Sequence, residues 1–330
     1  MQLLLFVITV IILLPLLIVG LIVFTYRIRR ISIPQKISGT ANEPFGARLW
    51  MHVAGTRDDP VAYALAGHLP VYNKLVKFLM VETFRIACRI SGYKGSVFAF
   101  PGPRPSGLAT FISHRTEFFD NSVNEALTNP ENPARQFVVL GAGWDTRCYD
   151  LPEDTQVKCF EIDMAPTLKA KVKGVQSAGI PHDHVTFVET DFNQRTWLDA
   201  LSNKGFDTNV TTYVLWEGVS VYLTENAVLD TLKLVATLPE GSTIAFDYFS
   251  KEFINGEPPY DNFTSKRMRE GASYYSETLT YGISTRKPAR DAVEKIVNEC
   301  GLQLRHFEHT HEEETPPLYA LATAVKQSNN

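Results

Sequence analysis

The sequence of 330 residues lacks the patterns that mark several common protein classes. Its four cysteines, Cys88, Cys148, Cys159 and Cys300, show no Cys-x-x-Cys spacing, which favours buried free thiols over a disulfide or zinc site. There is no His-Glu-x-x-His motif, so the histidines indicate no metal site. A net charge of −4 leaves no basic excess, which argues against nucleic-acid binding. Hydrophobic content is 45%, and no repeat or low-complexity tract is present, so the composition predicts a globular fold.

Charge is missing altogether between Leu3 and Phe24. As a helix this run is about 33 Å long, enough to cross the hydrocarbon core of a bilayer. Pro15 is tolerated in such a helix. The run predicts an uncleaved single-pass membrane anchor through residues 3–24. A cleaved signal peptide is the alternative, but the run is too long and has neither a basic segment before it nor a small-residue cleavage site after it.

Three arginines, Arg27, Arg29 and Arg30, follow the apolar run directly. Because positive charge flanks the cytosolic end of a membrane helix, they predict that the rest of the chain faces the cytosol. The sequons at Asn209 and Asn262 carry glycans only if the chain is lumenal. We therefore expect both to be unmodified.

The segment from Phe137 to Arg147 carries the strongest functional pattern. An apolar run, 137–140, ends in Gly141-Ala-Gly143, which is typical of a buried strand whose turn brings bare backbone close to a ligand. Arg147 lies near the place where a dinucleotide motif has its third glycine, and no lysine follows in P-loop spacing. The pattern therefore predicts a nucleoside without a pyrophosphate, and S-adenosylmethionine is the candidate.

A second predicted strand, 157–162, supports that interpretation. It leads into Asp163, about 20 residues after the glycines, the spacing that places a carboxylate on a ribose. Glu161 lies two residues earlier, on the same side of the strand, and is a second candidate for the ribose hydroxyls. Gly141 and Gly143 are expected to let the backbone approach the methionine part of the cofactor.

Four motifs in order give a resemblance to a known family. Leu140-Gly-Ala-Gly-Trp-Asp-Thr-Arg147, Phe160-Glu-Ile-Asp-Met-Ala-Pro166, Thr190-Asp-Phe192 and Leu215-Trp-Glu-Gly-Val-Ser-Val-Tyr-Leu-Thr224 resemble the leucine carboxyl methyltransferase family of S-adenosylmethionine-dependent enzymes. Upstream, His114-Arg-Thr-Glu-Phe-Phe-Asp120 is similar to its helical N-terminal region. The likeness covers roughly residues 35 to 326.

The resemblance implies further cofactor ligands. It ranks Asp163 above Glu161 for the ribose. Asp191 is expected to accept the adenine amino group, while the backbone N–H of Phe192 donates to a ring nitrogen. Arg115 is the candidate for the cofactor carboxylate, which a guanidinium binds through two hydrogen bonds.

Three more polar residues are expected at the rim of this site, Glu217 at the cofactor and Tyr222 and Asp247 near either the cofactor or the acceptor. Glu217 follows an apolar strand, where a carboxylate is costly unless paired, and the α-ammonium group of the cofactor is a suitable partner. Tyr222 and Asp247 lie on the same rim, with local packing as the equal alternative for both. No catalytic residue is assigned, but His114 and Tyr222 are the candidates, because a hydroxyl acceptor needs a base whereas a carboxylate does not.

From residue 137 onward, predicted strands and helices alternate, which favours a mostly parallel sheet with helices on both faces. The strands are expected at 137–140, 157–162, 185–189, 211–216, 243–248, 302–307 and 318–325, and helices at 224–237, capped by Thr224, and at 289–300. A seven-stranded, doubly wound, Rossmann-like class I methyltransferase sheet with a reversed final strand is what the resemblance implies. The expected boundaries are an anchor at 1–30, a linker at 31–45 and a methyltransferase domain at 46–330, with a helical cap at 46–130, a proline-rich loop at 98–107 and a lid insertion at 250–285.

The sequence as a whole predicts a membrane-anchored O-methyltransferase that faces the cytosol. The aromatic lid and the anchor favour a lipophilic small molecule as acceptor, with a carboxylate or hydroxyl group. A protein C-terminal carboxylate is the alternative acceptor. A catalytically inactive scaffold that binds S-adenosylmethionine is a further alternative, against which the intact cofactor motifs argue.

Overall fold

A computed structural model gives the fold and describes residues 1–94, 108–153, 155–309 and 316–327. The loop predicted at 98–107 lies outside the described residues. The chain forms two compact units. The N-terminal unit comprises Met1–Glu117, Gly143–Asp150 and Lys169–His182, and the sheet unit comprises Phe118–Ala142, Leu151–Leu168 and Asp183–Asn330.

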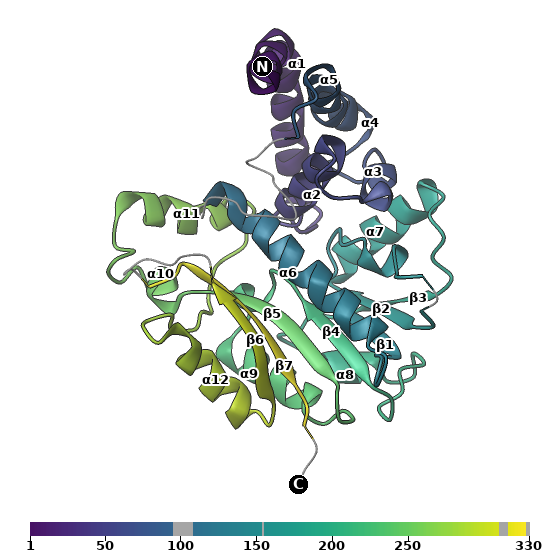
Figure 1. Cartoon of the computed structure of the whole chain (residues 1–330), viewed down its shortest axis with the longest axis vertical. Coiled ribbons are helices and arrows are strands. Elements are labelled where there is room, and N and C mark those ends of the chain that lie inside the picture. The colour runs from purple at the N-terminus through teal and green to yellow at the C-terminus, as the bar shows by residue number, and fades with distance from the viewer. Residues whose placement is uncertain (95–107, 154, 310–315, 328–330) are drawn as a thin grey trace. The chain divides into compact units, whose positions relative to one another are not determined.

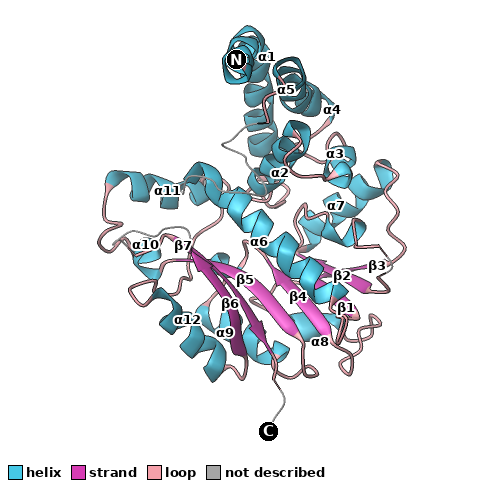
Figure 2. Cartoon of the chain, viewed as in Figure 1, coloured by secondary structure: helices cyan, strands magenta, loops and turns pink. Residues whose placement is uncertain are grey.

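A seven-stranded sheet in the order β3-β2-β1-β4-β5-β7-β6 forms the sheet unit (Figure 2). Neighbouring strands pair in parallel except at β7, which runs antiparallel to β5 and β6. The predicted doubly wound sheet is therefore confirmed. Chain order reverses between β1 and β4, a point where α/β sheets bind ligands. The strands are β1 (Gln136–Leu140), β2 (Lys158–Asp163), β3 (Val185–Glu189), β4 (Thr212–Trp216), β5 (Thr243–Phe249), β6 (Gln303–His309) and β7 (Tyr319–Val325).

Helices cover both faces of this sheet, because its central strands are apolar on both sides. One face packs against α8 (Trp197–Leu201), α9 (Glu225–Val235) and α12 (Ala289–Glu299) in a single buried cluster. On the other face lies the second half of α6 (Leu108–Thr128), where the Tyr213 hydroxyl lies 2.8 Å from the Ser122 hydroxyl (Figure 1).

Local signals set the helix ends largely as predicted. The Thr224 hydroxyl accepts a hydrogen bond from the Ala227 N–H at 3.3 Å, which confirms Thr224 as the cap of α9. Helix α12 ends just before Gly301, whose φ of 86° is typical of a glycine that stops a helix. Between β5 and α12 the chain forms α10 (Lys251–Asn255) and α11 (Phe263–Ser273).

Helices make up most of the N-terminal unit. Its core gathers Phe45, Leu49, Leu65, Val76 and Trp144. Helix α1 continues directly into a π-helical turn, η1, and together they form one apolar helix, Gln2–Ser32. Its mean hydropathy reaches 3.2, and it is long and apolar enough to span a membrane. The elements are α1 (Gln2–Arg27), η1 (Ile28–Ser32), α2 (Asn42–Ala54), α3 (Pro60–Leu65), α4 (Lys74–Val76), η2 (Lys77–Glu82), α5 (Thr83–Ser91), the first half of α6 and most of α7 (Ala165–Ser177).

Candidate cofactor site

The turn after β1 can be built only with glycine at its first position. Gly141 has a φ of 66°, and its N–H donates to the Ile162 carbonyl at the end of β2, at 2.8 Å. A Cβ atom at Gly141 would lie 2.3 Å from Cγ2 of Val219, which follows β4. Real Cβ atoms do not approach this closely, so the turn keeps its backbone bare. It therefore forms a cradle at the junction of β1, β2 and the loop after β4.

Two carboxylates on β2 point to the same side of the sheet but differ in depth. Asp163 is the last residue of β2, and its Oδ1 accepts a hydrogen bond from the Met164 N–H at 2.6 Å. Glu161 lies two residues inside the strand and is fully buried. A carboxylate at the strand end is the one that a ligand beyond the sheet edge can reach. The predicted ribose contacts of Asp163 and Glu161 stay predictions.

Asp191 follows β3 and is held by its own turn. Its Oδ1 accepts from the Asn193 N–H at 3.0 Å, and its Oδ2 accepts from the Gln194 side chain at 2.9 Å. The cap of the following helix, α8, is Thr196, so Asp191 is not an N-cap. Phe192 is half-buried and packs against the core of the sheet. The predicted adenine contacts of Asp191 and Phe192 stay predictions.

A buried aspartate organises the loop after β4, where Glu217 is half-buried. Asp247, on β5, accepts from the Gly218 N–H through Oδ1 at 2.6 Å and from the Tyr319 hydroxyl through Oδ2. Its carbonyl accepts from the Ser220 hydroxyl at 2.6 Å. Of the two interpretations left open for Asp247, the structure supports the local one, because these bonds fix the backbone beside Glu217.

The 3₁₀ turn η5 (Ser220–Tyr222) joins this loop to the predicted lid. The Val221 carbonyl accepts from the backbone N–H groups of Thr280 and Tyr281 at 2.7 and 3.1 Å. The Thr280 hydroxyl also donates to the Leu223 carbonyl at 2.8 Å. Tyr222 lies in this turn and is half-buried. The end of the lid segment is therefore tied to the loop that carries Glu217 and Tyr222.

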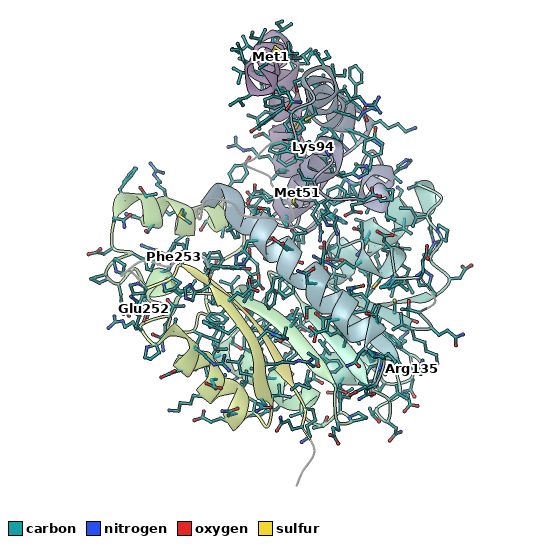
Figure 3. The ribbon with its side chains drawn as sticks, viewed as in Figure 1. Met1, Met51, Lys94, Arg135, Glu252 and Phe253 are labelled. Carbon is teal, nitrogen blue, oxygen red and sulfur yellow. The ribbon has the colours of Figure 1, made fainter. Side chains whose placement is uncertain are left out.

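The predicted lid and the last residue of β5 before it carry seven aromatic residues, which divide into two groups. Figure 3 labels Glu252 and Phe253 on α10, where Phe253 is buried. Its ring stacks on Phe249 and meets Tyr260 edge-on. Four of the rings pack inward in this way: Phe249, Phe253, Tyr260 and Tyr281. Three remain partly or largely exposed: Phe263, Tyr274 and Tyr275. The exposed rings are the ones available to an apolar ligand.

Glu252 anchors the base of the lid segment. Its buried carboxylate accepts hydrogen bonds from the Ser250 and Ser284 hydroxyls at 3.0 and 2.6 Å and pairs with Arg286 at 3.2 Å. Burial alone would raise the pKa of this carboxyl, but the hydrogen bonds, that from Ser284 foremost, hold it below its usual value. The segment is thus closed at its base by an ionised carboxylate.

In the N-terminal unit, the motif that follows the glycines forms a buried ionic cluster. Asp145 accepts through Oδ2 from Arg48 of α2 at 3.0 Å and through Oδ1 from the Arg147 N–H at 2.8 Å, and the Arg147 guanidinium pairs with it too. Burial raises the pKa of Asp145, but Arg147, Arg48 and Lys171 outweigh this and lower it strongly. Trp144 donates to Asn42 at 3.2 Å. The cluster clamps α2 to the chain after the glycine turn.

The remaining predicted residues also belong to the N-terminal unit. Gly143, the second glycine of the turn, belongs to this unit and has a φ of 42°. Arg115 is buried on α6, with its guanidinium 5.8 Å from the Phe111 ring centroid, and His114 beside it is half-buried. Asp163, Asp191 and Glu217, the acidic residues predicted to bind the cofactor, lie in the sheet unit. The roles of Arg115 and His114 at the cofactor therefore stay predictions.

Among the described residues, no group of three or more His, Cys, Asp or Glu side chains is placed to hold a metal ion, and the four cysteines are free and buried. Sequence reasoning missed the role of Arg48, which lies 97 residues from Asp145. The signal for it was the charged pair Asp145 and Arg147 in a segment next to a buried strand, because such charges require partners.

The glycine turn after β1 and the carboxylates at the end of β2 and after β3 lie at the strand ends where α/β sheets bind ligands. Residues 97–236 match the sequence profile of the family described as leucine carboxyl methyltransferase, so the resemblance seen in the motifs is confirmed over this segment.

Curated relatives agree with this assignment. One, named "Putative S-adenosyl-L-methionine-dependent methyltransferase YktD", from Bacillus subtilis, is 39% identical over 119 residues, which is 35% of this chain and 38% of the relative. A Mycolicibacterium vanbaalenii relative of the same general name is 33% identical, over 39% of this chain and 43% of its own. The chain thus spans less than half the length of these relatives.

Solved structures resemble the chain only distantly. A DUF574 family protein from Streptomyces avermitilis has a TM-score of 0.48 at 15% identity, over 85% of this chain and 97% of its own. Magnesium protoporphyrin IX methyltransferase from Synechocystis, solved with S-adenosylhomocysteine, has a TM-score of 0.42 at 12% identity, over 67% of this chain and 90% of its own. Scores this low say nothing about what this chain binds.

Proposed function

We propose that this chain is an S-adenosylmethionine-dependent O-methyltransferase. The observation that carries the proposal is the bare turn at Gly141, next to the carboxylate that ends β2. A side chain at Gly141 would overlap Val219, so the site fits a ligand that needs close contact with backbone. Parallel strands present their carboxyl ends at one edge, which brings Asp163, Asp191 and Glu217 to the same side as this turn.

In this proposal each of these residues binds one part of the cofactor. Asp163 accepts hydrogen bonds from the ribose hydroxyls, with Glu161 buried behind it. Asp191 accepts from the adenine amino group, and the Phe192 N–H donates to the ring. For the amino-acid end of the cofactor we propose Glu217 for the ammonium group, Arg115 for the carboxylate, and the backbone of Gly141 and Gly143 for the methionine part.

The bound cofactor supplies a methyl group that its sulfonium makes electrophilic. A lone pair of the acceptor oxygen forms the new C–O bond as the S–CH₃ bond breaks. The protein contributes by holding donor and acceptor in line and by keeping water out. A carboxylate acceptor needs no base. A hydroxyl acceptor loses a proton, and His114 or Tyr222 is the group we propose to take it.

The proposed acceptor is a lipophilic small molecule, supported by the exposed rings of the lid segment. The alternative acceptor, a protein C-terminal carboxylate, is supported by the family description. A tritiated methyl donor incubated with the full chain and either a lipid extract or a protein extract separates the two, because label enters only the fraction that holds the acceptor. Cofactor binding without transfer to either fraction would favour the inactive scaffold.

Cofactor binding is tested by calorimetry on the full chain. Asp163→Ala should weaken the affinity for S-adenosylmethionine by about 1–3 kcal/mol, the cost of unmatched polar partners. Asp230→Ala, an exposed aspartate on α9, is the matched control and should bind like the native chain. Equal affinities for native and Asp163→Ala protein would disprove the ribose assignment.

We further propose that α1 attaches the chain to a membrane with the remainder on the cytosolic side, where S-adenosylmethionine is supplied. Support comes from the apolar length of the helix and from Arg27, Arg29 and Arg30 after it. On that side Asn209 and Asn262 carry no glycan. A mass shift that endoglycosidase removes from the expressed chain would overturn this orientation. The single pass predicted from the sequence is one geometry for this attachment.

A further inference from the structure

A second helix lies along α1 within the N-terminal unit. The elements α4, η2 and α5 join into one continuous helix over residues 74–91, which we call the returning helix. Near one end of α1, the Phe24 ring lies 5.4 Å from that of Tyr72, just before the returning helix. Near the other end, the Phe6 ring lies 5.7 Å from that of Phe84. The two helices therefore run antiparallel as a hairpin (Figure 1).

The helices of this hairpin approach closely. A Cβ atom at Gly20 would lie 2.6 Å from Cγ of Met80, so a larger residue does not fit there without movement. Arg27 closes the hairpin by donating from Nε to the Pro70 carbonyl at 2.8 Å. Small residues at such positions are typical of helices that pack in membranes.

The returning helix carries an exposed apolar stripe. Leu75, Phe78, Ile86 and Ile90 are all exposed, Phe78 to 58% and Ile90 to 56%. Phe78 and Ile86 are eight positions apart, one more than about two turns of α-helix. The π-helical turn η2 absorbs the extra residue, so the stripe stays on one side.

Three charged residues of the returning helix, Lys77, Glu82 and Arg85, are directed away from this stripe, whereas Lys74 and Arg89 are exposed. Lys77 donates to the Tyr63 carbonyl at 2.6 Å, and Glu82 pairs with the Tyr63 hydroxyl and with Arg85 at 2.5 Å. Tyr63 belongs to α3, so these charges are directed toward the rest of the N-terminal unit. The separation of apolar and charged sides is that of a helix lying at a membrane surface.

A bilayer is the partner that fits this surface. The exposed leucines and isoleucines of α1, together with the stripe, exceed the apolar patch that a protein surface keeps in water. Exposed basic residues stand at both ends of the hairpin, Arg29 and Arg30 at one and Arg89 and Lys94 at the other. Such positively charged groups are attracted to the head groups of anionic lipids.

The hairpin does not fit an upright position in that bilayer. If α1 crossed the membrane with its packing intact, Lys77, Glu82 and Arg85 would be carried to hydrocarbon depth beside it. Charged residues at that depth are strongly disfavoured. If the hairpin instead lies parallel to the membrane, α1 and the stripe are immersed while these charges stay on the side of α3.

We infer that α1 and the returning helix form a monotopic hairpin that lies in the plane of one leaflet, so that Met1 stays on the same side as the rest of the chain. This inference rests on the membrane attachment proposed above and replaces the single pass. It assigns Leu75, Phe78, Ile86 and Ile90 as lipid-contacting residues.

The test uses the full chain made in the presence of microsomes, with a glycosylation sequon and an epitope added before Met1. Flotation first shows whether the chain binds membranes. The inference expects a bound chain with an unglycosylated epitope that protease removes from intact vesicles. A glycosylated, protected epitope on a bound chain establishes the single pass and overturns the hairpin. A chain that does not float overturns both the membrane attachment and the hairpin.

A second measurement reports on the stripe directly. Phe78→Cys and Ile90→Cys variants carry a fluorophore and are mixed with vesicles of phosphatidylcholine and phosphatidylserine that contain brominated acyl chains. We expect at least about twofold quenching at both positions, since a brominated chain quenches only an immersed group. Asp230→Cys, at an exposed position of α9 in the sheet unit, is the control and should not be quenched. If the brominated chains leave the emission at positions 78 and 90 as unchanged as that at position 230, the assignment of the stripe is overturned.

Discussion

Two aspartates of neighbouring motifs, Asp145 and Asp163, are both buried, yet they are held in different ways. Asp145 in the N-terminal unit binds the guanidinium groups of Arg48 and Arg147. Asp163 in the sheet unit ends a strand and accepts from the N–H of the next residue, Met164. A buried carboxylate neutralised by one arginine of a distant helix and one of its own turn stabilises the fold. A carboxylate at a strand end, beside its own backbone, is where we propose that the ribose binds.

The largest effect is expected at Asp145. Asp145→Asn removes the charge between two buried guanidinium groups, and breaking a buried ion pair in this way costs roughly 3–5 kcal/mol. Denaturant unfolding measures the loss. Asp58→Asn is the control, because the Asp58 side chain is 89% exposed and should change stability little. If Asp145→Asn is as stable as native protein but loses cofactor affinity, Asp145 is a ligand and the contrast with Asp163 fails.

A smaller effect is expected at the glycine turn. Gly141→Ala forces a Cβ atom against Val219 at a positive φ, and crowding of this kind costs roughly 1–3 kcal/mol. The double variant Gly141→Ala with Val219→Ala removes the crowding but not the strained φ, so it should recover part of the stability. Unfolding curves of the three proteins test this. Full recovery would show that backbone conformation is unimportant at Gly141.

Substitutions in the lid segment should separate effects on methyl transfer to the acceptor from effects on cofactor affinity. Tyr274→Ala and Tyr275→Ala should lower methyl transfer about tenfold, equivalent to about 1.4 kcal/mol, with cofactor affinity unchanged. Glu217→Gln and Arg115→Met should mainly lower the affinity for the cofactor. Calorimetry and turnover are measured on the same four variants, with Asp230→Ala, an exposed residue of α9 outside the lid, as the control. Equal loss of cofactor affinity in both groups would make the lid rings structural.

The smallest effect is expected on the pH dependence of folding stability. Because the folded-state pKa of Glu252 lies below its ordinary value of 4.5, its ionised form adds stability above that pH, and the contribution is lost as pH falls through the lower folded value. Glu252→Gln should therefore narrow the stability difference between pH 7 and pH 3. Thermal unfolding across this range checks it. An unchanged pH dependence would show that the Ser284 and Ser250 hydrogen bonds do not favour the ionised carboxylate.

Strands and caps were predictable because their signals are local. The ends of each predicted strand lie within about two residues of the observed ends. An apolar run between turn residues favours a strand through its own local pattern. Thr224 was recognisable because a cap bonds to its own helix three residues on. The spacing after the glycines identified Asp163 and Glu161 together, and the family resemblance ranked Asp163 first; Asp163 is the last residue of β2.

By itself, the sequence determined the order of strands and helices, the glycine turn and the apolar run of α1, because each depends on residues close together in the chain. Only the tertiary structure decided that Arg48 neutralises Asp145, that Asp247 supports the loop of Glu217, and that the returning helix lies along α1. These contacts join segments far apart in the chain. Their partners are selected by burial, since a buried charge or an exposed apolar face is stable only when folding brings a matching group to it.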